Sequence, residues 1–206
     1  MDDPFTLVDW RRQVAGLYAD VRASGADPAA AARFRAGRDR LFAQHPQSPL
    51  APEQRAHFRG LSYFPYDPAY RLVVPVRSAP PAERTVPAGE DGVVHLVRVG
   101  RLEFVLAGVP CGLEVYWLRG YGGGLFLPFA DATSGSETYG GGRYLLDTVK
   151  HADLGGDAAG LVLDFNYAYN PSCCYHERWV CPLAPPENRL PVAVRAGERD
   201  FRLAYS

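Results

Sequence analysis

Apolar residues in the first part of the chain recur at the three- and four-residue spacing of an amphipathic helix. Over residues 5–22 they are Leu7, Val8, Trp10, Val14, Leu17, Tyr18 and Val21. This spacing predicts one helix with a buried stripe. Thr6 precedes the first of them and is a candidate N-cap, because its hydroxyl can accept from a free backbone N–H of the first turn.

A break at residues 25–28 separates this helix from a second one. Asp27 is a typical N-cap residue, and Pro28 suits the first helical turn because its backbone has no N–H to leave unpaired. The apolar spacing then resumes through Phe42. We therefore expect a helical hairpin, followed by a short helix around residues 52–58 that Gly60 ends.

From Leu61 onward the pattern changes to short apolar runs separated by glycine and proline, which is typical of strands and turns. Strands are expected at about 61–65, 70–77, 93–99, 101–107, 113–119, 125–129, 143–148, 160–166 and 191–195. Val99-Gly100-Arg101 joins two alternating segments so tightly that an antiparallel hairpin is the simplest interpretation there.

The order of these elements indicates the fold class. No helical pattern of about 10–15 residues lies between strands, which disfavours a parallel, doubly wound sheet. We expect a mainly β protein, an antiparallel roll or barrel with a helical N-terminal arm, which is α+β if the helices are counted. Residues 1–206 are expected to form a single domain, with the arm at 1–60 and the β-roll or barrel at 61–206. The periodicities predict that these residues are buried: Trp10, Leu17, Phe42, Phe104, Val115, Phe126, Leu145, Leu163 and Phe165.

Composition places the chain among ordinary globular proteins. Hydrophobic residues make up 47% and charged residues 22%, which disfavours an intrinsically disordered chain or a collagen. The 22 basic and 23 acidic residues give a formal net charge of -1, so no basic excess is present for a nucleic-acid backbone. We expect no nucleic-acid partner, and the sequence leaves the oligomeric state open.

The N-terminal sequence MDDPFTLVDWRR opens with acidic residues and lacks the basic and apolar regions of a secretory signal. No apolar stretch is long enough to span a bilayer, so we expect no membrane partner and a cytoplasmic location. Cys111, Cys173, Cys174 and Cys181 are too few for the disulfide framework of a small secreted protein. In a reducing compartment they are expected as free thiols.

Two glycine-rich segments, residues 120–124 and 139–142, precede apolar runs. Neither continues with the lysine and hydroxyl residue of a phosphate-binding loop, and neither opens a helix. We interpret the glycines as turns or bulges at the entry to two strands, or as points where a ligand approaches the backbone. No nucleotide or other cofactor is expected.

Four long motifs identify a relationship. They are HPQSPL at residues 45–50, GLSYFPYDPAYR at 60–71, LFLPFADATSGSETYGGGRYL at 125–145 and LDFNYAYNPSCCYHERWVCPLAPPENRLPVAVRAGE at 163–198. In these motifs the chain resembles the bacterial family known as domain of unknown function 1684, from about His45 to Glu198. The resemblance implies no particular reaction.

Polar and aromatic residues are concentrated in two of these motifs. In LVLDFNY, strand alternation places Asp164 and Asn166 on one face, opposite the apolar residues. The predicted ligand-binding residues are Tyr139, Arg143, Asp164, Asn166 and His45. We expect the first four to converge on one cavity at the barrel mouth, with the histidine at its rim. The alternative is that Asp164 only pairs with Arg143, which neutralises its buried charge, or caps backbone groups at a turn.

Two other segments contain reactive residue types. Ser134 lacks the first glycine and the strand-to-helix context of a G-x-S-x-G motif, so we interpret it as a turn serine. Cys173, Cys174, His176 and Cys181 are zinc-ligand types, but their spacing lacks the second ligand pair of a structural zinc site. Buried free thiols or a Cys173–Cys181 disulfide are favoured over a metal site or a catalytic thiol, and no metal is expected.

Three functional hypotheses follow. The first is small-molecule binding, in which Arg143 favours an anionic ligand. The second is an enzyme with the same pocket, in which His45 or Asp164 transfers a proton. The third is that the motifs only lock irregular loops against the sheet. An enzyme needs a titratable group of perturbed pKa that faces a cavity, which separates the first two hypotheses.

Overall fold

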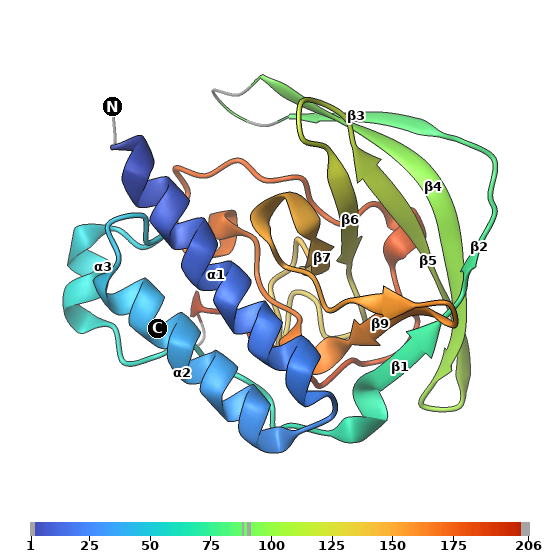
Figure 1. The fold of residues 1–206 in the computed structure, drawn as a ribbon, viewed down its shortest axis with the longest axis horizontal. Coiled ribbons are helices and arrows are strands. Elements are labelled where there is room, and N and C mark those ends of the chain that lie inside the picture. The colour runs from blue at the N-terminus through green and yellow to red at the C-terminus, as the bar shows by residue number, and fades with distance from the viewer. Residues whose placement is uncertain (1–2, 88, 90–91, 203–206) are drawn as a thin grey trace.

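A computed structural model describes residues 3–87, 89 and 92–202 of the protein (Figure 1). The helices are α1 (Pro4–Ser24), α2 (Pro28–Gln44) and α3 (Pro52–His57). The strands are β1 (Arg71–Val74), β2 (Val76–Arg77), β3 (Glu83–Pro87), β4 (Val93–Leu106), β5 (Val109–Leu118), β6 (Gly124–Phe129), β7 (Arg143–Asp147), β8 (Gly156–Asp157) and β9 (Gly160–Asp164). The described chain is therefore α-helical up to residue 57 and strand-bearing beyond it, as the change of apolar spacing predicts.

The helices α1 and α2 form the expected hairpin and lie side by side against one side of the strands (Figure 1). The Asp27 side chain caps α2 by accepting hydrogen bonds from two backbone N–H groups of the first turn, and Pro28 is the first residue of the helix. The first helix begins earlier than predicted. Its cap is Asp3 rather than Thr6, whose hydroxyl instead donates to the Asp3 carbonyl.

Aromatic rings join this hairpin to the rest of the core. Tyr18 of α1 meets Phe34 of α2 edge-on at 5.1 Å, and Phe34 meets Tyr167 edge-on at 5.0 Å. All three side chains are buried. Over the described ranges, neither α1 nor any other helix combines the length and the apolar character needed to cross a membrane.

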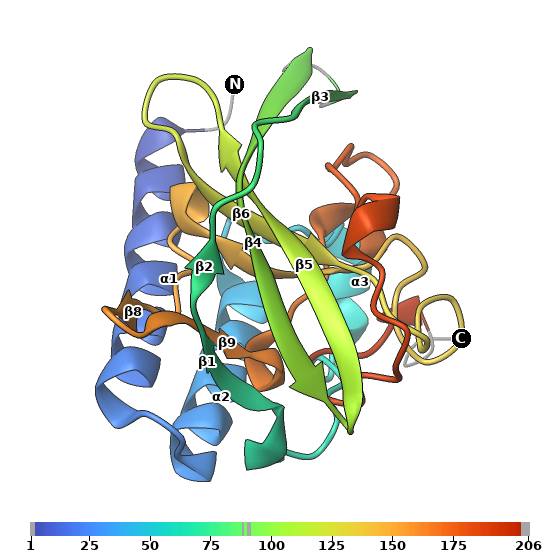
Figure 2. The same cartoon turned by 90° about the vertical axis from the view of Figure 1, so that its right-hand side faces the viewer.

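All the paired strands are antiparallel and form two sheets. One has the order β2-β4-β5-β6-β7, with β3 also paired to β4, and the other has the order β1-β9-β8. The larger sheet is a curved layer (Figure 2) that does not close, because β7 makes isolated bridges from Tyr144 to Tyr169 and from Asp147 to Ala152 instead of pairing with β2 or β3. The architecture is a roll, and the barrel alternative is wrong.

The hairpin predicted at Val99-Gly100-Arg101 is also wrong, because β4 runs straight through this position. A bulge between Arg98 and Gly100 shifts the pairing with β5, and the chain reverses later, at Ala107-Gly108. Ala107 and Gly108 have φ angles of 51° and 77°, the left-handed conformation that a tight turn needs. Gly100 instead allows close packing, since a Cβ at this position would overlap Val76 Cγ1.

The predicted core is largely confirmed. Phe42, Val115, Phe126, Leu145, Leu163 and Phe165 are buried. Trp10, Leu17 and Phe104 are half-buried at the edges of the apolar clusters. The residues predicted as a strand at 191–195 have no regular structure.

Candidate functional site

Arg143, a predicted ligand-binding residue, is fully enclosed in the protein interior. It lies on β7, and its Nη2 donates to Asp131 Oδ2 over 2.8 Å between side chains that are both 0% exposed. The same guanidinium donates to three backbone carbonyls of the segment 194–198. The predicted pairing of Arg143 with Asp164 is therefore wrong, since the nearer Asp131 takes this place.

The polar motif around Asp131 is a buried hydrogen-bond network. Asp131 Oδ1 accepts from the N–H and the hydroxyl of Thr133 over 2.7 and 2.6 Å, and Thr138 donates to the Thr133 hydroxyl over 2.9 Å. The N–H of Val194 also donates to this oxygen. These contacts attach the loop before β7 to the C-terminal segment, which is a structural role.

Two further predicted residues, Tyr139 and His45, occupy separate places. The Tyr139 hydroxyl donates to Cys173 Sγ over 3.5 Å. His45 is buried at the end of α2, where its Nδ1 accepts from Gln47 N–H and its Nε2 lies 3.1 Å from Asp9 Oδ2. Since Nδ1 accepts, Nε2 carries the proton and donates to Asp9.

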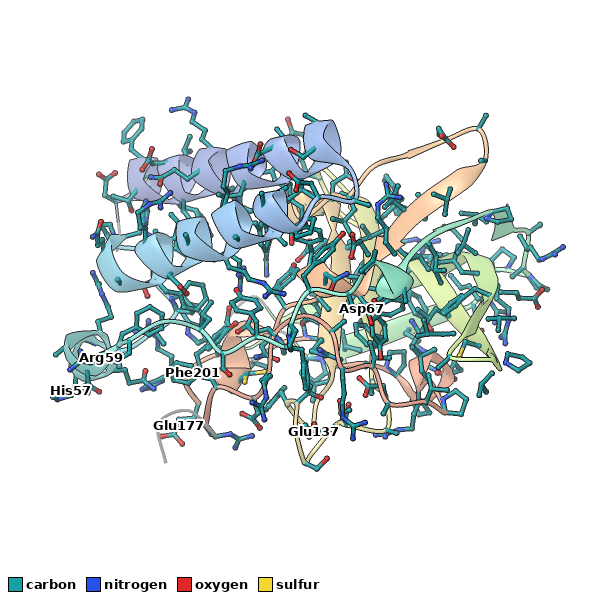
Figure 3. All side chains as sticks on the ribbon, turned by 90° about the horizontal axis from the view of Figure 1, so that it is seen from below. His57, Arg59, Asp67, Glu137, Glu177 and Phe201 are labelled. Atoms are coloured by element: carbon teal, nitrogen blue, oxygen red, sulfur yellow. The ribbon has the colours of Figure 1, made fainter. Side chains whose placement is uncertain are left out.

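Asp164 and Asn166 are brought together, although not by a strand face. The strand β9 ends at Asp164, and residues 165–167 form a 3-10 turn that Asp164 caps. Asp164 Oδ1 accepts from Asn166 N–H over 3.0 Å and from Asn166 Nδ2 over 2.9 Å. The Asn166 amide also pairs with both backbone groups of Asp67, which lies on the connection before β1 (Figure 3).

Asp164 is a buried carboxylate with incomplete charge compensation. Its nearest cation is Arg71 of β1, with 3.8 Å between Arg71 Nε and Asp164 Oδ2. Burial raises the pKa of Asp164, and the hydrogen bonds from Asn166 and the charges of Arg71 and Arg35 only partly oppose this shift.

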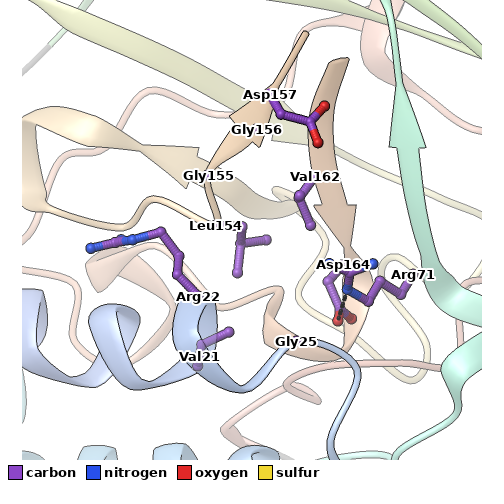
Figure 4. Close-up of a pocket in the computed structure, with 10 residues that line it drawn as sticks. All are labelled: Val21, Arg22, Gly25, Arg71, Leu154, Gly155, Gly156, Asp157, Val162 and Asp164. Carbon is purple, nitrogen blue, oxygen red and sulfur yellow. Dashed lines mark ion pairs between the residues drawn. The ribbon is translucent and has the colours of Figure 1, made fainter. Parts of the chain in front are cut away.

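A cavity of about 250 Å³ lies between α1 and the smaller sheet. Its lining residues are Val21, Arg22, Gly25, Arg71, Leu154, Gly155, Gly156, Asp157, Val162 and Asp164. Figure 4 shows the Arg71–Asp164 pair at one end of this cavity and Asp157 near the other. Of the predicted site residues, Asp164 is the one that lines it.

Several buried polar groups near Asp164 have no hydrogen-bond partner within the described part of the chain. They are Arg35 Nε and Nη2, the Tyr66 hydroxyl and the Tyr167 hydroxyl. Arg35 and both tyrosines interact electrostatically with the Asp164 carboxylate. Burial lowers the pKa of Arg35, whose guanidinium carbon lies 4.7 Å from the centre of the Tyr63 ring. Buried donors are normally paired, so these groups define a polar site with unused hydrogen-bonding capacity.

The sequence interpretation missed most of this site. Tyr66, Arg71 and Tyr167 belong to the motifs GLSYFPYDPAYR and LDFNYAYN, so the motifs could have indicated them as candidate site residues. Arg35 lies in a helix with no distinctive motif, so nothing in the sequence pattern selects it. Across the described ranges, no group of three or more His, Cys, Asp or Glu side chains is arranged to hold a metal ion.

Replacing Asp164 with asparagine should raise the melting temperature at pH 7 by a few degrees. The amide retains an oxygen for the Asn166 donors and carries no charge to desolvate. A carboxyl whose pKa rises on folding destabilises the native state above that pKa, and the penalty disappears as the pH falls toward the unfolded-state value.

The advantage of Asp164→Asn should therefore shrink as the pH falls from 7 toward about 4, which thermal melts at several pH values can measure. Asp157→Asn is the matched control, because Asp157 lines the same cavity but is exposed. A variant that melts below the unmodified protein at every pH would contradict this account of Asp164.

The fold and the cavity define an antiparallel β-roll protein with a helical arm and a partly open cavity of mixed polar and apolar lining between the arm and the smaller sheet. The chain belongs to the family described as Protein of unknown function (DUF1684), whose model matches residues 56–199. It is 36% identical to an uncharacterised protein of Haloarcula marismortui solved by solution NMR, with a TM-score of 0.57. That match covers 81% of this chain and 90% of the other. No curated protein matches the chain.

The family match confirms the resemblance and includes most of the residues of the candidate site. It contains Tyr66, Arg71, Asp164 and Tyr167, whereas Arg35 and His45 precede its first residue, 56. The match begins at residue 56, whereas the resemblance in the motifs begins at about His45. Neither the family description nor the similar protein's description names an activity.

Proposed function

We propose that this protein binds a small anionic molecule beside Asp164. The residues that bind it are Arg35, Arg71, Tyr66, Tyr167 and Asp164. One observation carries the proposal. Within the described residues, two N–H positions of the Arg35 guanidinium and the hydroxyls of Tyr66 and Tyr167 are buried without a hydrogen-bond partner, and all three side chains interact electrostatically with the Asp164 carboxylate. This site replaces the barrel-mouth pocket expected at Tyr139 and Arg143.

The donor set determines the ligand chemistry. A guanidinium has only donors, arranged as a planar fork that fits a carboxylate or a phosphate. Two guanidinium groups, Arg35 and Arg71, accompany the Asp164 carboxylate, and the carboxylates of Asp27 and Asp67 also act electrostatically on the tyrosines. An anion would supply the acceptors that the unpaired N–H and O–H groups need, and each such pairing removes a penalty of about 1–3 kcal/mol.

Asp164 and the cavity size narrow the class further. Its carboxylate accepts hydrogen bonds, so a ligand hydroxyl beside the acidic group would be recognised there. The cavity of about 250 Å³ is lined by Arg71 and Asp164 but not by Arg35, Tyr66 or Tyr167. Its volume is below the roughly 300–1,000 Å³ of ordinary ligand pockets, which favours a compact molecule. The proposed ligand is a hydroxylated carboxylate or phosphate of metabolite size.

The variant Arg35→Gln should weaken anion binding at least tenfold while the protein stays folded, because glutamine has neither the charge nor the fork. Isothermal titration with inorganic phosphate, citrate and glycerate measures the affinity, and thermal melting checks the fold. Arg40→Gln is the matched control, since Arg40 lies on the same helix with an exposed side chain. Equal affinity in the two variants, or no binding of any of these anions, would contradict the proposal.

A second candidate is an enzyme in which Asp164 transfers a proton. The raised pKa of Asp164 and its position at a cavity favour this candidate. His45 does not support it, because its ring is hydrogen-bonded to Asp9 and Gln47. Incubation of the unmodified protein with its ligand separates the candidates. A binding protein releases the ligand chemically unchanged, whereas an enzyme converts it, and conversion is then lost in Asp164→Asn.

A further inference from the structure

Three side chains outside the proposed binding site, Cys173, Cys181 and Tyr139, form a hydrogen-bonded cluster. Cys173 follows Pro171 in a 3-10 turn, and its thiol hydrogen-bonds to that of Cys181. The Tyr139 hydroxyl donates to Cys173 Sγ over 3.5 Å. Both thiols are half-buried and free, so a small oxidant can reach them.

The two thiols are electrostatically unequal. Hydrogen bonds from Cys181 and Tyr139 lower the pKa of Cys173 to about 6, because they stabilise its thiolate. The same contact raises the pKa of Cys181, which keeps its proton. The contact therefore favours a thiolate on Cys173 and a protonated thiol on Cys181.

The other cysteines lack these features. Cys174 is buried, and burial raises the pKa of its thiol. Cys111 is also buried, on β5, with its pKa raised for the same reason. Reactivity toward oxidants follows thiolate character and exposure, so it is concentrated at Cys173.

We propose that Cys173 and Cys181 form a redox-active dithiol that peroxides convert reversibly into a disulfide, with Cys173 as the attacking thiolate and Cys181 as the resolving thiol. Cys173 Sγ attacks one oxygen of hydrogen peroxide, the O–O bond breaks, and the hydroxide released takes a proton to become water. The product is a sulfenic acid. Cys181 Sγ then attacks Cys173 Sγ, the S–O bond breaks, and the Cys181 proton leaves with the oxygen as a second water.

The reaction closes a short loop on the protein surface. Two thiols are oxidised by two electrons in total and one peroxide is reduced to two waters, while a dithiol reductant reverses the change. The enclosed residues 174–180 include Trp179, whose Nε1 donates to the Pro49 carbonyl over 2.9 Å. Trp179 therefore links the loop to the segment between α2 and α3.

Peroxide treatment of the full chain, followed by peptide mass spectrometry, tests the proposal. The free thiols should fall from the four present to two, with one Cys173–Cys181 cross-link that dithiothreitol removes. Cys111→Ser should leave the cross-link unchanged. In Cys181→Ser, dimedone should trap a sulfenic acid at Cys173. Initial oxidation at Cys111 or Cys174, or no cross-link between Cys173 and Cys181, would overturn the proposal.

The role of Tyr139 as a positioning residue has its own measurement. The alkylation rate of Cys173 should fall to half near pH 6, against about 8.5 for an ordinary cysteine. Tyr139→Phe should move this midpoint upward, since the thiolate loses a donor. An alkylation midpoint near 8.5 in the unmodified protein would also overturn the proposal.

Discussion

Replacing Arg143 with methionine should destabilise the fold by about 3–5 kcal/mol, because it leaves a buried charge without a partner. Arg143 and Asp131 are both 0% exposed, with 2.8 Å between Nη2 and Oδ2. The substitution also removes the donor to three carbonyls of the segment 194–198. Denaturant unfolding followed by circular dichroism measures the change in the free energy of unfolding.

Arg195 offers a matched control for this prediction. Its ion pair with Glu137 has the same 2.8 Å separation, but the arginine side chain is 60% exposed. Arg195→Met should cost less than about 1 kcal/mol, since water screens exposed pairs. Equal losses for Arg143→Met and Arg195→Met would contradict the structural role of Arg143.

Adding Asp131→Leu to Arg143→Met should restore only part of the lost stability. Removing both charges abolishes the unpaired carboxylate, but Asp131 also accepts from Thr133 and Val194. Those donors and the carbonyls of the segment 194–198 would stay unpaired.

The second large effect is expected for Phe165→Ala, at about 3–5 kcal/mol of lost stability. Phe165 is 0% exposed and meets Phe129 edge-on at 5.2 Å. It also lies beside Phe104, with 6.1 Å between ring centres. Truncation therefore leaves a cavity bordered by the rings of Phe104 and Phe129.

Phe5→Ala is the comparison for this truncation, because Phe5 is 79% exposed. It should change the free energy of unfolding by less than about 0.5 kcal/mol. A loss below about 1 kcal/mol for Phe165→Ala would show that this ring is not at the centre of the core.

Local patterns predicted the elements that local physics determines. Capping by Asp27 and the apolar spacing define the second helix, and the strands near 125–129 and 143–148 were found within a residue or two. The continuity of β4 could not be predicted in the same way. A glycine-containing bulge and a tight turn have similar sequence patterns. Pairing of β4 with β2 and β5 is what keeps the strand continuous at Gly100.

In the candidate site, too, local patterns predict contacts between neighbouring residues but not contacts between distant ones. The proximity of Asp164 and Asn166 follows from a spacing of two residues, whether the backbone is a strand or a turn. The ion pairs of this region do not follow from the sequence. Arg143 pairs with Asp131, and the cation nearest to Asp164 is Arg71, with 3.8 Å between Arg71 Nε and Asp164 Oδ2. Arg35 joins the site only through the packing of α2, which a helical pattern does not reveal.

The side-chain Nε–H resonance of Arg35 tests the central claim most directly. Its NMR signal can be assigned as the one missing from Arg35→Gln and followed during titration with phosphate and citrate. An anion that binds this guanidinium should shift the signal in a saturable way. A signal that stays in place while other resonances report anion binding would contradict the account.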